Sequence, residues 1–277
     1  MKQFSIYAFF FITFISFAQS RDSAYNIDIK VLYRLDYTKY VGSEKKVSEN
    51  QVLIVKNGGN SCFTFENMVA LDSIQKIRTL NLADVMSYKS PLYYLIKRKD
   101  NIISHFELVG NDLIKYDENI AFEWKLVDDS KMINGYNCKK ATIIFEGREW
   151  IAWYAVEIPV NVGPYKFYDL PGLILELSDT HNLFRFSILS LETGYFEIND
   201  DTSNYFISDG NNTIQTVEKY DFHSIRKKFH QMSMAESIKY MNRGAAGVYG
   251  AEIISLDGEN VNTNRKPKTK NFIEKYD

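Results

Sequence analysis

The side chains best suited to catalysis are three carboxylates that lie close together in the sequence. Glu157, Asp169 and Glu176 fall within one short stretch, near Arg148 and Glu149. Two carboxylates can act as general acid and general base when their environments separate their pKa values. No spacing among these residues requires such a pair, and charged residues at strand ends are usually solvated. We therefore assign no catalytic residue, and a carboxylate-based hydrolase stays as an alternative.

The histidines do not form a metal-binding pattern. They are scattered along the chain as His105, His181, His223 and His230. His223 and His230 would lie two helical turns apart, which is too far for the one-turn spacing of a zinc pair on a helix. The sequence also lacks a serine nucleophile elbow, a phosphate-binding glycine loop and a dinucleotide fingerprint. We therefore predict no metal and no cofactor.

Cys62 and Cys138 are the two cysteines of the sequence. In an oxidising compartment an even pair indicates one disulfide. Such a bond would close a loop of roughly 76 residues and add ~4 kcal/mol of stability from chain entropy. The alternative is two separate buried thiols, because the sequence gives no Cα separation. Neither cysteine has a second ligand at CxxC spacing, so neither indicates a metal site.

An aromatic and proline-rich stretch carries the most information. Its members are Trp150, Trp153, Tyr154, Pro159, Gly163, Pro164, Phe167, Leu170, Pro171, Gly172, Leu173 and Ile174. One interpretation is a rigid structural corner, in which the prolines and glycines shape the backbone. The other is a binding surface, because Trp and Tyr favour interfaces. We favour the corner. On the predicted strand Trp150 and Tyr154 share one face, and Trp153 lies on the other.

The prolines of this stretch also predict its backbone. Pro159 and Pro164 prevent a central strand between them, because proline cannot donate to a ladder. We expect a strand that ends at Ile158, then a turn and a short loop, and a second strand from Gly172. A glycine at that position lets two backbone segments approach closely.

The same stretch resembles the signature of the GLPGLI family of secreted bacterial proteins, whose motif reads here as Asp169-Leu-Pro-Gly-Leu-Ile. The resemblance extends to Ile133–Thr142 and to Asn271-Phe-Ile-Glu274, which is similar to the family's terminal Asn-Pro-Ile-Glu. Asp169 replaces the family's first glycine. Because Asp tolerates a left-handed backbone, we expect the turn to survive. The family has no settled biochemical role, so the resemblance implies export and no particular reaction.

Residues Met1–Ala18 resemble an export signal. Lys2 gives the positive start, Phe4–Phe17 is mostly apolar, and Ser16 and Ala18 are small residues before a cleavage site. The apolar run is shorter than the ~20 residues of a membrane span, although an uncleaved anchor is the alternative. No cysteine follows directly to accept a lipid. We predict a mature chain without a transmembrane span, located in the periplasm or at the outer-membrane periphery.

The composition fits a globular β-rich protein. The sequence has 33 basic and 35 acidic residues. This near-neutral balance argues against nucleic acid as a partner. Aromatic residues make up 15% of the chain, and Tyr and Phe favour strands. A mature chain of about 260 residues lies near the upper limit for one hydrophobic core.

Strict alternation of apolar and polar residues from Tyr25 to Leu35 predicts a strand with one buried face. Further strands are predicted over Gln51–Lys56, from Cys62, and over Leu92–Lys97, Ile102–Val109, Asp112–Tyr116, Phe122–Val127, Lys139–Phe145, Trp150–Glu157, Gly172–Leu177 and Leu183–Leu191. Short strands joined by hairpin-sized turns indicate an antiparallel sheet. So many strands cannot stay flat. We therefore predict a mainly β fold with helices (α+β), in which a curved antiparallel sheet forms a half-barrel or a sandwich.

Two segments change to helical spacing. Glu66–Lys89 predicts one or two helices that cover a face of the sheet. Asp221–Met241 predicts a helix with Asp221 as its N-cap and with Arg226 in a solvated basic group. Residues 1–18 are then a signal peptide, 19–258 a single domain, and 259–277 a polar, flexible C-terminal tail.

A curved sheet of this size has a concave apolar face that must be covered. The expected outline is similar to the LolA-like half-barrel carriers of lipoprotein acyl chains. Our first hypothesis is an exported, non-catalytic binding protein for an apolar ligand or an outer-membrane protein partner. A second is an accessory subunit of an outer-membrane complex that docks by strand addition, through an edge strand or Asn271–Glu274. The third is the hydrolase.

Overall fold

The structure is a computed structural model that describes residues 28–56, 59–78, 90, 92–196, 214–241 and 269–274. Four predicted features lie outside these residues: the signal peptide over residues 1–18, the start of the first strand at Tyr25, residues 79–89 of the predicted helical segment, and residues 259–268 and 275–277 of the predicted tail. The division into a signal, one domain and a tail therefore stays a prediction for those parts.

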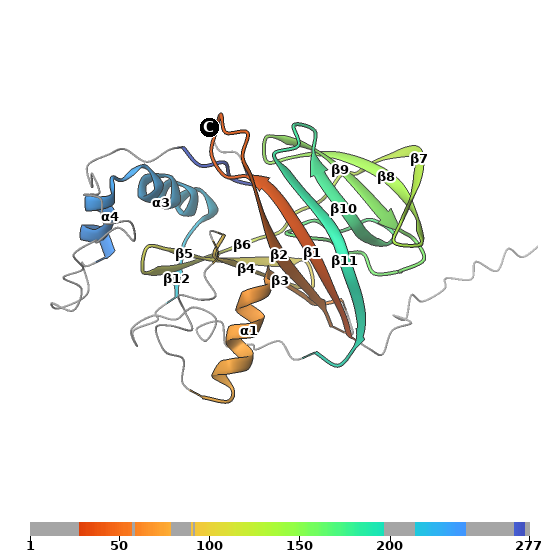
Figure 1. Cartoon of the computed structure of the whole chain (residues 1–277), viewed down its shortest axis with the longest axis horizontal. Helices are drawn as coiled ribbons and strands as arrows, with labels where there is room; N and C mark the ends of the chain where they lie inside the picture. The colour runs from red at the N-terminus through yellow and green to blue at the C-terminus, as the bar shows by residue number, and fades with distance from the viewer. Residues whose placement is uncertain are drawn as a thin grey trace, which may run out of the picture.

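Within the described residues, twelve strands form a single curved sheet (Figure 1). Their order across the sheet is β12-β6-β5-β4-β3-β2-β1-β11-β10-β9-β8-β7. The strands are β1 (Asp28–Thr38), β2 (Lys46–Val55), β3 (Ser61–Phe65), β4 (Tyr94–Lys99), β5 (Ile102–Val109), β6 (Asp112–Glu118), β7 (Lys125–Ile133), β8 (Tyr136–Phe145), β9 (Arg148–Ala155), β10 (Leu173–Asp179), β11 (Phe184–Gly194) and β12 (Gln215–Thr216). All neighbours are antiparallel except β12 and β6. The predicted mainly β fold is confirmed, as one open curved sheet and not a sandwich.

The alternating pattern of the first strand decides which face of the sheet is buried. Val31, Tyr33 and Leu35 are each fully buried on the concave face of β1, while Arg34 between them is exposed. Burying each such side chain contributes roughly 1.5–3 kcal/mol. Because strand period is two, this pattern fixes the register against both neighbours, β2 and β11.

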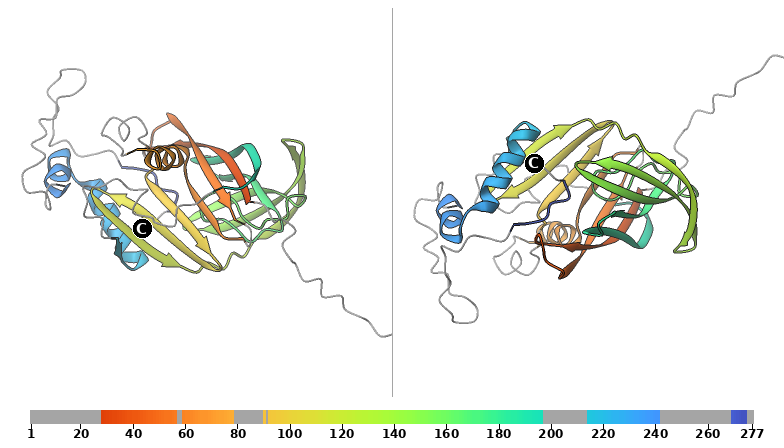
Figure 2. Two further views of the ribbon diagram at one scale, coloured as in Figure 1. Left: turned by 90° about the horizontal axis from the view of Figure 1, so that it is seen from below. Right: turned by 90° about the horizontal axis from the view of Figure 1, so that it is seen from above.

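Helices cover both faces of the β2–β6 part of the sheet (Figure 2). His105 pairs with Tyr116 across β5 and β6, and Phe106 pairs with Lys115, so neighbouring positions point to opposite faces. Phe106 packs in one cluster with α1 (Glu66–Gln75), whereas Tyr116 packs against α3 (Lys219–Gln231). None of the helices in the described ranges has both the length and the apolar composition of a bilayer span.

The predicted helix over Asp221–Met241 is wrong in its start and its continuity. The helix α3 begins at Lys219, and the chain breaks before α4 (Met234–Met241). The break is a capping box, in which the Ser233 backbone N–H donates to the Glu236 carboxylate at 2.7 Å and the Glu236 N–H donates to Ser233 Oγ at 3.3 Å. Arg226, expected in solvent, is 6% exposed.

The predicted strand over Phe122–Val127 is wrong for its first three residues and correct for Lys125–Val127. Strand β7 begins at Lys125, and Phe122 and Trp124 lie before it in a non-strand segment. Their rings pack at 5.6 and 6.0 Å from the ring of Phe167. Aromatic composition alone favoured a strand here, but these side chains are used to fill the core.

Of the two alternatives for the cysteines, the structure shows separate thiols and no disulfide. Cys62 and Cys138 carry separate buried thiols, on β3 and β8 respectively. Five strands lie between β3 and β8 in the sheet. Strands are spaced ~4.8 Å apart, which puts these cysteines far beyond the reach of one bond. They also belong to different hydrophobic clusters.

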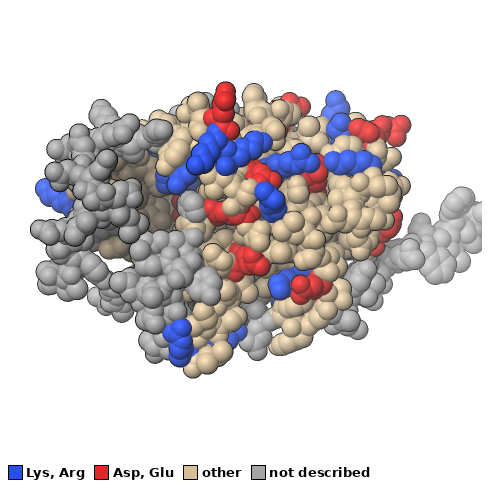
Figure 3. Space-filling view, viewed as in Figure 1, with Lys and Arg blue, Asp and Glu red and all other residues tan. Residues whose placement is uncertain are grey.

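Charged side chains of both signs lie side by side on the surface seen in Figure 3. One ion pair of the surface joins Lys140 and Asp129 at 3.2 Å. Such pairs contribute about 0–1 kcal/mol each. Other charged side chains, described below, are paired in the interior.

Candidate functional site

The loop between β9 and β10, residues 156–172, lies inside the curved sheet; we call it the signature loop. All six residues from Gly163 to Tyr168 are buried. An antiparallel bridge joins Val162 and Tyr168, so the loop doubles back as a small hairpin. The Phe167 ring lies 4.9 Å from Trp150 and 5.2 Å from Phe145. The loop therefore fills the concave face that an open half-barrel would leave empty.

Two residues of the signature loop have a left-handed backbone, Tyr165 at φ 60° and Asp169 at φ 76°. The left-handed backbone expected at Asp169 is therefore found. Tyr165 is bulky, so its conformation costs free energy and persists only where surrounding contacts impose it. Its hydroxyl donates to Glu274 Oε1 at 3.0 Å, and its ring packs edge-on against Tyr94 at 5.6 Å.

Gly172 ends the loop at a backbone contact. A Cβ atom placed there would lie 2.1 Å from the carbonyl oxygen of Ala155. No side chain fits in this space, so the expected close approach at Gly172 is confirmed. Gly163 is restricted differently, because its Cβ would meet the Ile174 side chain at 2.6 Å.

The segment 269–274, which we call the C-terminal segment, runs into the end of the sheet. Its Asn271 N–H donates to the Lys39 carbonyl at 2.9 Å. The buried Arg148 guanidinium donates to the carbonyls of Ile273 at 3.0 Å and Phe272 at 2.8 Å. The predicted flexible tail is therefore wrong for these residues. They are held by backbone hydrogen bonds, a feature that polar composition does not reveal.

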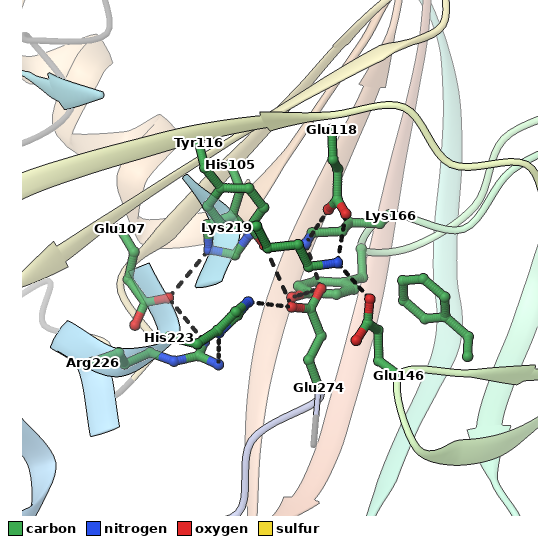
Figure 4. Close-up of polar contacts among 12 residues, drawn as sticks. His105, Glu107, Tyr116, Glu118, Glu146, Lys166, Lys219, His223, Arg226 and Glu274 are labelled. Atoms are coloured by element: carbon green, nitrogen blue, oxygen red, sulfur yellow. Dashed lines mark hydrogen bonds and ion pairs between the residues drawn. The ribbon is translucent and has the colours of Figure 1, made fainter. Parts of the chain in front are cut away.

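The signature loop and the C-terminal segment meet at one buried ion pair (Figure 4). Lys166 and Glu274, both with fully buried side chains, contact each other directly. Lys166 Nζ also donates to Glu118 Oε1 at 2.6 Å and contacts the Tyr116 hydroxyl. Burial would raise the pKa of Glu274, but the charges of Lys166 and Lys219 offset this and hold that pKa well below its usual range.

The ion pair continues into a network on α3. Lys219 donates to Glu118 at 2.6 Å and to Glu146 at 2.5 Å, tying the helix to β6 and to the β8–β9 turn. Further along the helix, Arg226 pairs with Glu107 at 3.3 Å and donates to His223 Nδ1 at 3.1 Å. Each charge thus has a partner of opposite sign, as burial requires.

Two groups of this network, Glu107 and His223, have pKa values far from neutral pH. Arg226 and His105 lower the pKa of Glu107 to about 2 against the effect of burial. Burial, helped by the charge of Arg226, lowers the pKa of His223 to about 2. A general acid or base works best with a pKa near the working pH. The pKa values of Glu107 and His223 lie several units below neutral pH.

We expect stability to fall as the pH drops from about 6.5 to 2. The unfolded chain protonates its histidines below pH ~6.5 and its carboxylates below pH ~4.3, whereas His223 and Glu274 resist protonation in the fold. The unfolded state therefore binds more protons across this window. Glu274→Gln should flatten the part of the profile below pH ~4.5, whereas Glu157→Gln, an exposed control, should not. Urea denaturation at several pH values measures this, and parallel profiles for the two variants would contradict it.

A cleft of about 40 Å³ remains on the concave face beside the C-terminal segment. Its walls come from β1, β4, β5, α3 and the C-terminal segment. Aromatic rings of Tyr37, Tyr94, Tyr165 and Phe272 line it, and His105 and Glu107 lie among them. The cleft is therefore small and concave, and it combines aromatic walls with a few convergent polar groups, the lining that is typical of ligand sites.

The structure separates the three predicted carboxylates. Glu157 and Asp169 are exposed on the signature loop. Glu176 lies on β10, where Lys131 binds it at 2.8 Å and Arg185 at 2.9 Å. No contact joins the three in the part of the chain that the structure describes. They do not form a catalytic pair.

The predicted arrangement of the aromatic residues is found. Trp150 and Tyr154 are 0% and 2% exposed on the concave side. Trp153 is half-buried on the other face, beneath Lys131 at 4.4 Å and Lys140 at 5.5 Å from its ring centre. Trp153 therefore makes cation–π contacts with two lysines on the outer face of the sheet. Most residues of the aromatic and proline-rich stretch are buried in the core.

Sequence reasoning missed the residues of the buried network. Lys166 was an available signal, because a lysine between Tyr165 and Phe167 in an apolar loop needs a partner if the loop is buried. Glu274 was marked only through the resemblance of its segment. Glu107 and Arg226 carried no signal, since Glu107 alternates with apolar residues on a strand and Arg226 begins a basic run, as solvated charges do.

Comparison with solved structures supports the fold. No curated protein matches the sequence. Two crystal forms of PNGF-II are similar at 17% and 18% identity with a TM-score of 0.52, and each alignment covers 75% of this chain. The chain spans about a third of PNGF-II, with 34% of that chain covered. A LolA superfamily protein from Nitrosomonas europaea is similar at 10% identity with a TM-score of 0.25, over 66% of this chain and 91% of that one, and bears on no ligand.

The sequence match to a family is local and centred on the signature loop. It spans residues 145–176, from the end of β8 through β9 and the signature loop into β10. The GLPGLI name stays a prediction. The matching model is that of a family described as "Protein of unknown function (Porph_ging)".

Proposed function

We propose that the protein is an exported, non-catalytic binding protein of the cell envelope, and that its ligand enters the cleft beside the C-terminal segment. One observation carries the proposal. The concave face is filled by the signature loop around Phe167, yet a cleft lined by Tyr94, His105 and Phe272 is left beside it. Aromatic walls with convergent polar groups favour ligand binding. The displaced pKa values of Glu107 and His223 favour binding over catalysis.

The lining favours a polar ligand over an acyl chain. His105, Glu107 and Arg226 contribute charged or hydrogen-bonding groups to the cleft. Its volume of about 40 Å³ is well below the ~300–1,000 Å³ of pockets that enclose larger ligands. An apolar ligand of acyl-chain size would need the C-terminal segment to leave the concave face.

Docking by strand addition is the weaker alternative. The edge strand β7 carries Lys125 and Lys131 and has an irregular register between Val127 and Ser130. Charges and bulges are the features that keep edge strands from pairing with other chains. The other proposed docking element, Asn271–Glu274, is already bound within the fold.

Blocking the cleft tests the proposal. His230→Trp adds bulk at a half-buried cleft position of α3, whereas Lys228→Trp places the same side chain on the exposed side of the helix. Native mass spectrometry of protein isolated from the exporting cells should find a bound molecule on the wild type and on Lys228→Trp, and none on His230→Trp. A wild type without a bound molecule, or a molecule kept by a folded His230→Trp, would contradict the proposal.

A further inference from the structure

The cleft has an excess of positive charge. Lys39 and Lys270 line it, and both are half-buried. Neither ammonium group has an ion-pair partner in the residues that the structure describes. Among the lining residues the one carboxylate is Glu107, and it is already engaged by Arg226 at 3.3 Å and His105 at 3.2 Å. Glu49 attracts Lys39 and Glu107 attracts Lys270 through space, but no described carboxylate lies within ion-pair distance of either ammonium group.

Burial and the excess positive charge together lower the pKa values of Lys270 and His230. Burial lowers the pKa of Lys270, and the charge of Lys39 lowers it further. Burial also lowers the pKa of His230 to about 4, with Lys270 as the next cause. Like charges held together in a partly buried site disfavour each other's protonated forms. An anion in the cleft would relieve this repulsion.

His105 supplies a second, independent feature. The side chain is 1% exposed, and its Nδ1 atom has no hydrogen-bond partner. Burial keeps the pKa of His105 below its usual value, so the ring is neutral near pH 7. Its Nε2 faces the ionised Glu107 carboxylate at 3.2 Å and must carry the proton, because a carboxylate only accepts. The bare Nδ1 is then an acceptor without a donor, which is costly when buried.

We propose that the cleft binds a small hydroxycarboxylate, with its carboxylate between Lys39 and Lys270 and its hydroxyl donating to His105 Nδ1. This inference rests on the proposed binding function and names the ligand chemistry of that site. A volume of about 40 Å³ holds roughly three water molecules at 10–15 Å³ each, so the ligand, or the end of it that enters, is small.

Glycolate is the probe, because it carries both groups on two carbons. Acetate lacks the hydroxyl, and phosphate tests whether any oxyanion suffices. Isothermal titration at low salt should show glycolate binding, with acetate weaker by about threefold or more for the lost hydrogen bond. Phosphate should bind more weakly than glycolate.

Lys39→Met combined with Lys270→Met should weaken glycolate binding about tenfold or more, as expected for charge-assisted contacts. Lys45→Met, an exposed lysine, should change nothing.

A spectroscopic readout avoids substitution of the buried histidine. The ¹⁵N resonance of His105 Nδ1 should shift when glycolate binds and stay in place with acetate. Equal affinities for glycolate and acetate, or an unmoved Nδ1 resonance, would overturn the hydroxyl contact. No binding of glycolate, or binding unaffected by the lysine double variant, would overturn the anion site. If glycolate fails but native mass spectrometry finds another molecule that His230→Trp displaces, the proposed binding function stands without the hydroxycarboxylate. If no such molecule is found either, both proposals fail.

Discussion

Replacing Lys166 with methionine is expected to lower the free energy of unfolding by about 3–5 kcal/mol, the usual cost of removing one partner of a buried ion pair. Glu274 would keep its charge in a site where its side chain is fully buried, with its closest cation lost. Glu118 would lose one of its two lysine partners and keep Lys219. Urea denaturation of the wild type and the variant measures the loss.

A double variant and a surface control separate the ion pair from general disruption. Adding Glu274→Gln to Lys166→Met removes the orphaned charge and should recover part of the loss, giving an interaction energy of ~1–3 kcal/mol. Lys140→Met breaks the exposed pair with Asp129 and should cost about 0–1 kcal/mol. If Lys166→Met cost no more than Lys140→Met, the buried pair would not hold the C-terminal segment.

Replacing Gly172 with alanine is the second large effect. The added methyl group would lie 2.1 Å from the Ala155 carbonyl oxygen and 2.6 Å from its carbon. Both are backbone atoms at the end of β9, so they cannot move aside as a flexible side chain can. The loss should reach the upper end of the ~1–3 kcal/mol range for overpacking.

Two other glycines calibrate this loss. Gly194→Ala meets Phe196 at 3.5 Å, an ordinary contact, and should stay within ~0.5 kcal/mol of the wild type. Gly163→Ala meets the Ile174 side chain and should fall between the two. A Gly172→Ala loss as small as that of Gly194→Ala would show that the loop adjusts without cost.

Both predictions concern one structural device. Gly172 lets the signature loop turn back against β9, and the loop in turn presents Lys166 to Glu274. The residues that match a family and the C-terminal segment are thus joined by a buried charge pair. Their contact closes the concave face and leaves the cleft beside it. We infer that the binding site depends on this closure.

The strands were predictable because their signal is local. In β1 the alternation of Val31, Tyr33 and Leu35 with polar residues needs no knowledge of distant parts of the chain. The errors arose where another local signal competed. Ser233 with Glu236 starts a new helix inside an otherwise continuous helical pattern, and Phe122 with Trp124 has a strand-like composition but serves as core filling.

The residues of the candidate site could not be predicted from local sequence patterns. Lys166 and Glu274 are 108 residues apart in sequence, and Glu107 and Arg226 are 119 apart. Each of these charges looks like an ordinary solvated residue in its own segment. Their burial follows only from the way the curved sheet brings the segments together.

The mainly β class, the antiparallel pairing and the lack of a strand between Pro159 and Pro164 follow from the sequence alone, because side-chain period and backbone restrictions act between near neighbours. The tertiary structure decided which charges are buried, that Cys62 and Cys138 stay apart, and where the cleft lies. Electrostatic pairing and cavity shape depend on distances across the fold, and those distances are set only when the sheet curves around the signature loop.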